Sequence, residues 1–120
     1  MVLSEILSGG IRLGGIRASA SGFGSDMTQL GRFGVWRGYG EFTPDGAHEL
    51  EELGYGTLWL GGSPGAELPN VEDLLAATTS LTVATSIVNV WASPAKEVAE
   101  SFHRIDSRYP GRFLLGIGGR

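Results

Sequence analysis

Three tryptophans are the first residues of this sequence whose type and position suggest a binding function. Trp36, Trp59 and Trp91 each lie at or near the predicted C-terminal end of a β-strand. In both common architectures of parallel strands, ligands bind at that end of the strands. Three flat apolar side chains around one mouth suit a planar cofactor and an apolar substrate. We therefore expect these tryptophans to line a substrate pocket, with ordinary packing as the alternative.

A glycine-rich strand end and one asparagine are the candidate cofactor-binding residues. Gly116 and Gly118 end the last predicted strand, where glycine lets a phosphate or a ring approach the backbone; a plain turn is the alternative. Asn89 ends the most β-branched run and can either hydrogen-bond a flavin-like heterocycle or cap the strand end. An earlier Gly-Tyr-Gly at 38–40 lacks the third glycine of a dinucleotide fingerprint and is weak evidence.

Composition and charge exclude several other classes of chemistry. The chain has no cysteine, which excludes disulfides, thiolate metal sites and cysteine nucleophiles. His48 and His103 lie on predicted helices without carboxylates at ligand spacing, so we predict no metal site and no Ser-His-Asp triad. A net charge of -4 argues against nucleic acid as a partner. Because no apolar run approaches the ~20 residues of a membrane span, we expect a cytoplasmic protein without a membrane partner.

The elements that must position these residues alternate between strands and helices. The pattern predicts strands at 31–36, 57–60, 81–90 and 113–117, and helices that begin after Thr43, Asn70 and Ser93, each a good N-cap residue. The first helix is predicted over 44–53, with Ala47, Leu50 and Leu53 on its apolar face and its glutamates, Glu51 among them, on a solvated face. Glu100 is expected to pair with Arg104. No two-residue hairpin turn occurs. Four parallel strands with intervening helices follow, as an open doubly wound sheet or as half of a barrel that needs about 250 residues.

The first 26 residues do not join this pattern. They are rich in glycine and small residues, and Gly-Gly-Ile-Arg occurs at 9–12 and again at 14–17. This composition is typical of a low-complexity segment. We therefore expect residues 1–26 to be a disordered leader and residues 27–120 to form the folded domain.

The order of the segments resembles a known family, the luciferase-like monooxygenase superfamily, and in particular its coenzyme F420-dependent oxidoreductases. The resemblance covers about Leu30 to Gly118. It rests on Leu-Gly-Arg-Phe-Gly-Val-Trp at 30–36, Glu-Glu-Leu-Gly-Tyr at 51–55, Thr-Leu-Trp-Leu-Gly-Gly at 57–62, Ala-Thr-Ser-Ile-Val-Asn-Val-Trp at 84–91 and Tyr-Pro-Gly-Arg-Phe-Leu-Leu-Gly-Ile-Gly at 109–118. The last of these motifs is the most specific.

The resemblance implies a fold, a cofactor and an activity. The fold is the first half of a TIM-like (β/α)8 barrel, whose third strand carries a bulge with a cis peptide that supports the middle ring of the cofactor. Ser86-Ile87 matches that bulge, although composition alone gives this dipeptide no role. The implied activity is hydride transfer between coenzyme F420 and a small organic substrate. FMN-dependent monooxygenation is one alternative. A non-catalytic half-barrel, which forms a homodimer or associates with a missing C-terminal half, is the other.

Overall fold

The structure, a computed structural model, describes residues 29–119 of the chain. Its elements are β1 (Gly34–Gly38), α3 (Pro44–Glu52), β2 (Thr57–Gly61), α4 (Val71–Ala76), β3 (Thr82–Thr85), β4 (Val88–Asn89), α5 (Ala95–Arg108), β5 (Phe113–Leu114) and β6 (Ile117–Gly118). The leader expected at 1–26 lies outside the described residues. None of the helices in the described part is both long and apolar enough to cross a membrane.

Helix α3 begins where the sequence predicts. Thr43 is its N-cap, and the Thr43 hydroxyl accepts a hydrogen bond from the N–H of Gly46 at 3.0 Å. Pro44 fills the first helical position, where no backbone donor is needed. The helix ends at Glu52, one residue earlier than predicted, and Leu53 is 75% exposed. Placing Leu53 on the apolar face is therefore wrong, whereas Ala47 is fully buried.

The other two helices begin without the predicted side-chain caps. Asn70 occupies the N-cap position of α4, but its side chain donates instead to the carbonyls of Tyr39 and Phe42, at 3.2 and 3.0 Å. Pro94, rather than Ser93, is the N-cap residue of α5 and provides no side-chain acceptor. Both expected caps are wrong, because the side chain of Asn70 is used between loops and α5 begins one residue later.

Two ion pairs hold α5 against α4. Arg104 lies 3.0 Å and Arg108 lies 2.8 Å from the carboxylate of Glu72. Arg104 also donates to the carbonyl of Glu67 at 2.9 Å. The expected pair between Glu100 and Arg104 is therefore replaced by contacts between helices. These side chains are partly exposed, so the ion pairs orient the helices more than they stabilise them.

All strand pairs are parallel, and the sheet divides in two. Strands β1, β2, β3 and β5 form a four-stranded sheet in that order, and β4 pairs with β6 in a second, two-stranded sheet. The two strands predicted at 81–90 and 113–117 are therefore each interrupted. The first is divided at Ser86-Ile87 and the second at Leu115-Gly116. The interruption lies at the C-terminal ends of the strands, where the sequence pattern predicts a ligand.

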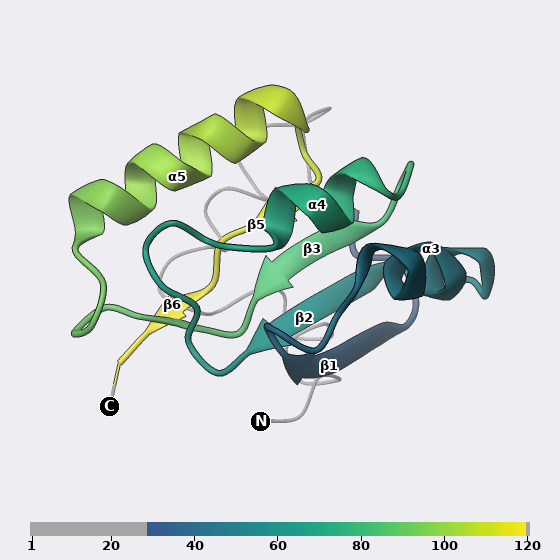
Figure 1. Cartoon of the computed structure of the whole chain (residues 1–120), viewed down its shortest axis with the longest axis horizontal. Helices are drawn as coiled ribbons and strands as arrows, with labels where there is room; N and C mark the ends of the chain where they lie inside the picture. Colours follow the sequence, from purple (N-terminus) through teal and green to yellow (C-terminus); the bar gives the residue numbers. More distant parts are fainter. Residues whose placement is uncertain (1–28, 120) are drawn as a thin grey trace.

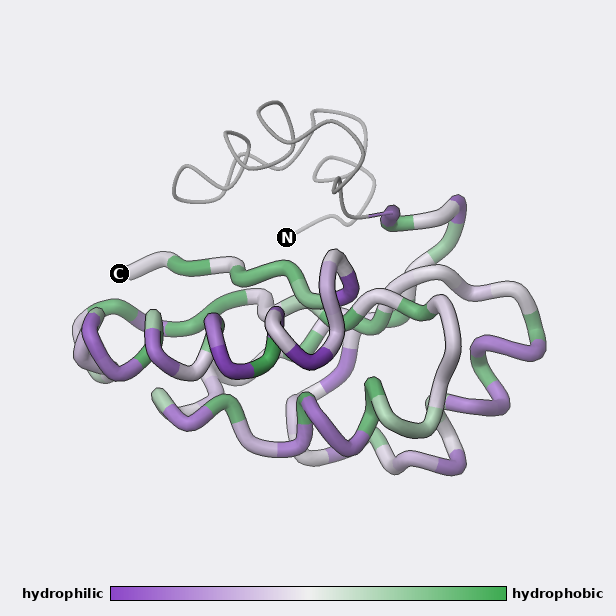
Figure 2. The backbone as a smooth tube through the Cα atoms, turned by 90° about the horizontal axis from the view of Figure 1, so that it is seen from above, coloured by the Kyte–Doolittle hydropathy of each residue, from purple (hydrophilic) through white to green (hydrophobic). Residues whose placement is uncertain are grey.

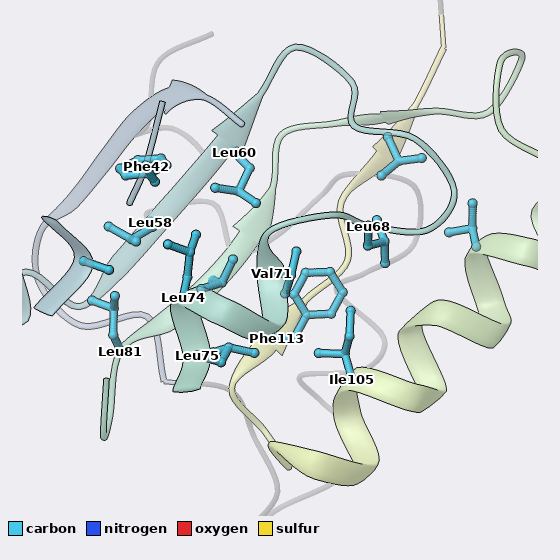
Figure 3. Packing of buried hydrophobic residues seen from close by; sticks show 14 of the residues in the cluster. Phe42, Leu58, Leu60, Leu68, Val71, Leu74, Leu75, Leu81, Ile105 and Phe113 are labelled. Atoms are coloured by element: carbon cyan, nitrogen blue, oxygen red, sulfur yellow. The ribbon is translucent and has the colours of Figure 1, made fainter. Parts of the chain in front are cut away.

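Every described helix covers the same face of the sheet (Figure 1). Strand residues and helix residues meet in one hydrophobic cluster, drawn in Figure 3, to which the strands contribute Leu58, Leu60, Val83 and Phe113 and the helices contribute Ala47, Val71, Leu74, Leu75, Val98 and Ile105. Figure 2 shows hydrophobic stretches along the strands and hydrophilic residues along the helices. A doubly wound sheet would carry helices on both faces. The fold is thus α/β with the arrangement of half a TIM-like barrel.

Candidate functional site

The candidate site is the interruption of the sheet at Ser86-Ile87. The peptide bond between these two residues is cis, as the resemblance implies. Ser86 is still part of the ladder, since its N–H donates to the carbonyl of Leu60 at 2.7 Å. Beyond Ile87 the chain pairs with β6 instead. The dipeptide therefore marks the point where β3 leaves its neighbours.

A buried threonine closes the gap on one side of the interruption. The hydroxyl of Thr85 donates to the carbonyl of Gly116 at 2.8 Å and accepts from the N–H of Gly116 at 2.8 Å. Thr85 is fully buried, and these two bonds replace backbone pairing between β3 and the segment that joins β5 to β6. A valine at this position would leave the N–H of Gly116 without that acceptor.

A serine closes the gap on the other side. Strand β2 ends at Gly61, so the N–H of Asn89 has no backbone acceptor there. The hydroxyl of Ser63 takes that place and accepts from the N–H of Asn89 at 2.9 Å. Ser63 belongs to the loop after β2, which lies at the C-terminal edge of the sheet. Two side-chain hydroxyls, Thr85 and Ser63, thus support the two sides of the interruption.

The side chain of Asn89 shapes the turn that follows β4. Its Oδ1 accepts a hydrogen bond from the N–H of Trp91 at 2.8 Å, which fixes the orientation of the amide. Its backbone carbonyl accepts from the N–H groups of Ala92 and Ser93, at 3.1 and 3.0 Å. The strand-end role, one of the two alternatives for Asn89, is therefore present. In the described part of the chain its Nδ2 has no acceptor, so the amide keeps donors for a ligand.

At the two glycines predicted to bind the cofactor, contacts within the protein already use the backbone groups of Gly116 and the space beside Gly118. Gly116 is buried, and its backbone already bonds Thr85 and the N–H of Val88. A Cβ on Gly118 would lie 2.6 Å from Cδ1 of Ile87, so the space above this glycine holds the isoleucine side chain. A ligand at this edge would contact Ile87 rather than bare glycine backbone. The role of both glycines in cofactor binding stays a prediction.

Trp36 and Trp59 are paired on the sheet face opposite the helices. They are register partners on β1 and β2, and each ring lies over a glycine of the other strand. A Cβ on Gly34 would lie 2.6 Å from Nε1 of Trp59, and a Cβ on Gly61 would overlap the ring of Trp36. Both residues are central in their strands, so placing them at strand ends is wrong. Glycines across the strand boundary make room for rings at these central positions.

The three tryptophans differ greatly in exposure. Trp59 is fully buried, and its Nε1 is the one buried side-chain polar atom among residues 29–119 without a hydrogen-bond partner. Trp36 is 50% exposed. Trp91 is 80% exposed and follows β4, where its Nε1 would lie 2.5 Å from a Cβ on Gly119. The structure thus brings Trp36 and Trp59 together and places Trp91 on a different pair of strands. A substrate pocket formed by them stays a prediction.

At the opposite, N-terminal edge of the sheet, Glu51 makes contacts that the sequence pattern does not predict. Its carboxylate accepts from the backbone N–H groups of Thr79 at 3.0 Å and of Ser80 and Leu81 at 2.8 Å. Burial alone would raise the pKa of Glu51, but the hydrogen bonds from Ser80, Thr79 and Leu81 lower it to about 2. The predicted solvated role is wrong for this residue, because its side chain folds back onto the loop before β3.

Arg112 completes the same edge and gives the Gly-Arg-Phe motif a structural role. Its Nε donates to the carbonyl of Leu81 at 2.8 Å, and its Nη2 donates to the hydroxyl of Thr78 at 2.7 Å. Burial lowers the pKa of Arg112, and the charge of Glu51 opposes that change. Gly111 has a φ of 73°, which favours glycine, and turns the chain toward β5. The motif therefore fastens β5 to the loop before β3.

The comparisons with known proteins give one result. Residues 27–119 match the family model described as luciferase-like monooxygenase. Searches of curated proteins and of solved structures found no significant match. The matched range contains all of the described residues and so includes both edges of the sheet described above. Because the match extends over most of the chain, this protein belongs to the luciferase-like monooxygenase family.

Proposed function

We propose that this chain binds coenzyme F420 at the C-terminal edge of its sheet and takes part in hydride transfer to or from a small organic substrate. The observation that supports the proposal is the interruption of parallel pairing at the ends of β3 and β5, in a member of a family whose proteins use flavin or deazaflavin cofactors. In parallel α/β folds, ligands bind at this edge.

The residues at the interruption suit a planar heterocycle. Ile87 presents an apolar side chain beside Gly118, and Asn89 keeps two N–H donors on Nδ2. Thr85 and Ser63 hold the backbone on either side, so the apolar surface and the donors are fixed before a ligand arrives. When bound, the deazaflavin supplies the hydride chemistry. The task of the chain is to orient one ring face and to exclude water from it.

Absorbance titration tests the proposal. The full chain is titrated with F420 and, separately, with FMN, and the visible spectrum of each cofactor is followed. We expect saturable perturbation of the F420 spectrum. Saturation with FMN alone would replace the proposal by the FMN-dependent monooxygenase alternative. A dissociation constant of about 1 mM corresponds to a binding free energy of about -4 kcal/mol, which is weak binding. If neither spectrum changes at cofactor concentrations up to about 1 mM, the proposal is wrong.

A second candidate function, a half-barrel that acts through association, is favoured by the sheet edges. In the described part of the chain, β1 and β5 each pair on one side only. Open strand edges are sites at which another chain can add. We propose a second copy or a complementary C-terminal half as the partner, in the cytoplasm. Light scattering on the full chain measures whether it associates with itself. A monomer that binds neither cofactor and unfolds cooperatively contradicts both candidate functions.

A further inference from the structure

A row of side chains crosses the sheet on the face that the described helices do not cover (Figure 1). Its members are register partners on β1, β2, β3 and β5, namely Trp36, Trp59, Ala84 and Leu114. Side chains alternate between the two faces along a strand, and the residue before each of these four packs in or against the hydrophobic cluster under the helices. We call the four residues the open-face row.

Most of the open-face row is buried. Trp59 and Ala84 are 0% exposed and Leu114 is 7% exposed, and these are the three buried hydrophobic residues of the described part that lie outside the cluster of Figure 3. One side of the Trp59 ring lies over Gly34, but on an uncovered sheet its other side would contact water. The burial of the row therefore requires a cover over β2, β3 and β5, and the described helices do not provide it.

The chain enters the described part on this same face. Thr57 and Thr82 are register partners two positions before members of the row, so their side chains share the open face. The hydroxyl of Thr57 donates to the carbonyl of Leu30, and the hydroxyl of Thr82 donates to the carbonyl of Gln29 at 2.6 Å. Followed backward, the chain passes from β2 to β3 along the N-terminal edge. The residues before Gln29 thus start beside the middle of the open face.

Those residues are numerous and apolar enough to form the cover. Outside residues 29–119 this sequence has residues 1–28 and residue 120. When extended, residues 1–28 span up to roughly 90 Å, whereas four paired strands are about 15 Å wide. Because the row is buried within a single chain, a second copy is not needed as the cover. The segment's apolar residues include Ile6, Leu7, Ile11, Leu13 and Ile16.

We propose that residues 1–28 dock on the open-face row and cover it, in place of the disordered leader expected from their composition. Apolar side chains of the segment pack on the buried members of the row, and burial of apolar surface drives the contact. In a closed barrel, side chains of the remaining strands share this interior space. A complementary half therefore has to displace the segment before a barrel can close.

Thiol labelling tests whether the row is covered. The sequence contains no cysteine, so a single introduced thiol reports on one position. Ala84→Cys places a thiol in the open-face row, Ala47→Cys places one in the cluster under the helices, and Ser107→Cys places one on the exposed side of α5. Rates of reaction with N-ethylmaleimide are measured on the full chain. We expect the thiol of Ala84→Cys to react roughly 100-fold more slowly than that of Ser107→Cys.

The identity of the cover is tested by making the segment polar. One variant replaces five apolar residues by serine: Ile6, Leu7, Ile11, Leu13 and Ile16. The matched control keeps these and replaces five serines by alanine: Ser4, Ser8, Ser19, Ser21 and Ser25. We expect the serine variant to raise the rate for Ala84→Cys roughly 10-fold or more and to leave Ala47→Cys within about twofold, while the alanine control changes neither.

Disulfide formation decides the result if the serine variant unfolds, which circular dichroism and faster labelling of Ala47→Cys would reveal. Ala84→Cys is combined in turn with Ile11→Cys, Leu13→Cys and Ile16→Cys, and dilute protein is oxidised. A disulfide requires the two Cα atoms to lie within about 7 Å. We expect at least one combination to give a disulfide within one chain, detected by mass spectrometry, and the same combinations with Ala47→Cys to give none.

Several results would overturn the proposal. Equal reactivity of Ala84→Cys and Ser107→Cys in the chain with its natural segment would show that the face is open. Protection that persists in a folded serine variant would show that another part of the molecule covers the row. Protection that is lost on dilution, or disulfides that form only between chains, would identify a second copy as the cover. An unfolded serine variant together with no disulfide within one chain would also contradict the proposal.

Discussion

The two edges of the sheet are built from different kinds of contact. At the N-terminal edge, the charged side chains of Glu51 and Arg112 hold the backbone of the loop before β3. At the C-terminal edge, the neutral hydroxyls of Thr85 and Ser63 hold the backbone around Ser86-Ile87, and donors on Ser63 and Asn89 remain unused in the described residues. Both edges are thus held by side chains that bond the backbone, charged at the N-terminal edge and neutral at the C-terminal edge, and the proposed ligand site lies at the C-terminal edge.

The strongest way to break this comparison is to remove the hydroxyl of Thr85. Thr85→Val keeps the shape of the side chain but leaves the buried N–H of Gly116 without its acceptor. We expect the free energy of unfolding to fall by about 2–3 kcal/mol, measured by urea denaturation. Thr85→Ser keeps the hydroxyl and should lose less. Equal losses in the two variants would show that packing, rather than the hydrogen bonds, is responsible.

The N-terminal edge is tested by Glu51→Gln, which removes the charge and one strong acceptor. The carboxylate is partly exposed, so we expect a loss of about 1–2 kcal/mol in the free energy of unfolding near neutral pH. Glu49→Gln, on the same helix and exposed, is the control and should change stability by less than about 0.5 kcal/mol.

The difference in the free energy of unfolding between wild type and Glu51→Gln should also depend on pH. The pKa of Glu51 is lowered from 4.5 to about 2 in the folded protein, so its contribution is complete above pH 4.5 and is lost as the pH falls toward 2. The difference between wild type and Glu51→Gln should therefore narrow across that window in urea titrations at several pH values. A difference that stays constant down to pH 2 would contradict the assigned hydrogen bonds.

A smaller effect is expected from Gly118→Ala at the C-terminal edge. The new Cβ would meet the flexible end of Ile87, which must rotate away. We expect a loss below about 1 kcal/mol in stability, with a larger relative change in cofactor affinity because Ile87 borders the proposed site. Ile87→Val in the same chain should restore part of the stability. No restoration would mean that backbone, and not Ile87, is the obstacle.

The smallest effect is expected at Leu53. This residue follows α3 and is 75% exposed. Leu53→Gln should change the free energy of unfolding by less than about 0.5 kcal/mol in thermal or urea denaturation. Because Leu53 lies only two positions from Glu51, a small effect would show that the stability of the N-terminal edge depends on the contacts of Glu51 and not on the end of α3 in general. A loss of 1 kcal/mol or more would indicate that the end of α3 is covered in solution.

The sequence predicts the elements better than the contacts between them. Four strands, three helices and the cap at Thr43 follow from local patterns of β-branched, apolar and capping residues, and the described part of the chain contains them, with two of the four strands divided. The interruption within 81–90 could not be read from composition, because the run is β-branched on both sides of Ser86-Ile87. That dipeptide was indicated only by the family resemblance.

The residues missed at both edges share one property. Glu51, Ser63 and Thr85 bond backbone groups that lie 26 to 31 positions away along the chain. Patterns with a period of two or of 3.6 residues report on local faces and carry no information about such contacts. One signal was available, since Ser63 stands among glycines. Trp36 was misplaced for a related reason, because the bounds of β1 depend on its pairing with β2.

The exchange of rings and glycines between β1 and β2 has a consequence for how this sequence can evolve. Trp36 occupies the space that a side chain at Gly61 would need, and Trp59 occupies the space above Gly34. A larger residue in place of either glycine requires a smaller residue in place of the tryptophan that lies over it. Among relatives, positions 36 and 61 should therefore vary together, as should 34 and 59, and single substitutions at either glycine should be found only with a compensating change across the strand boundary.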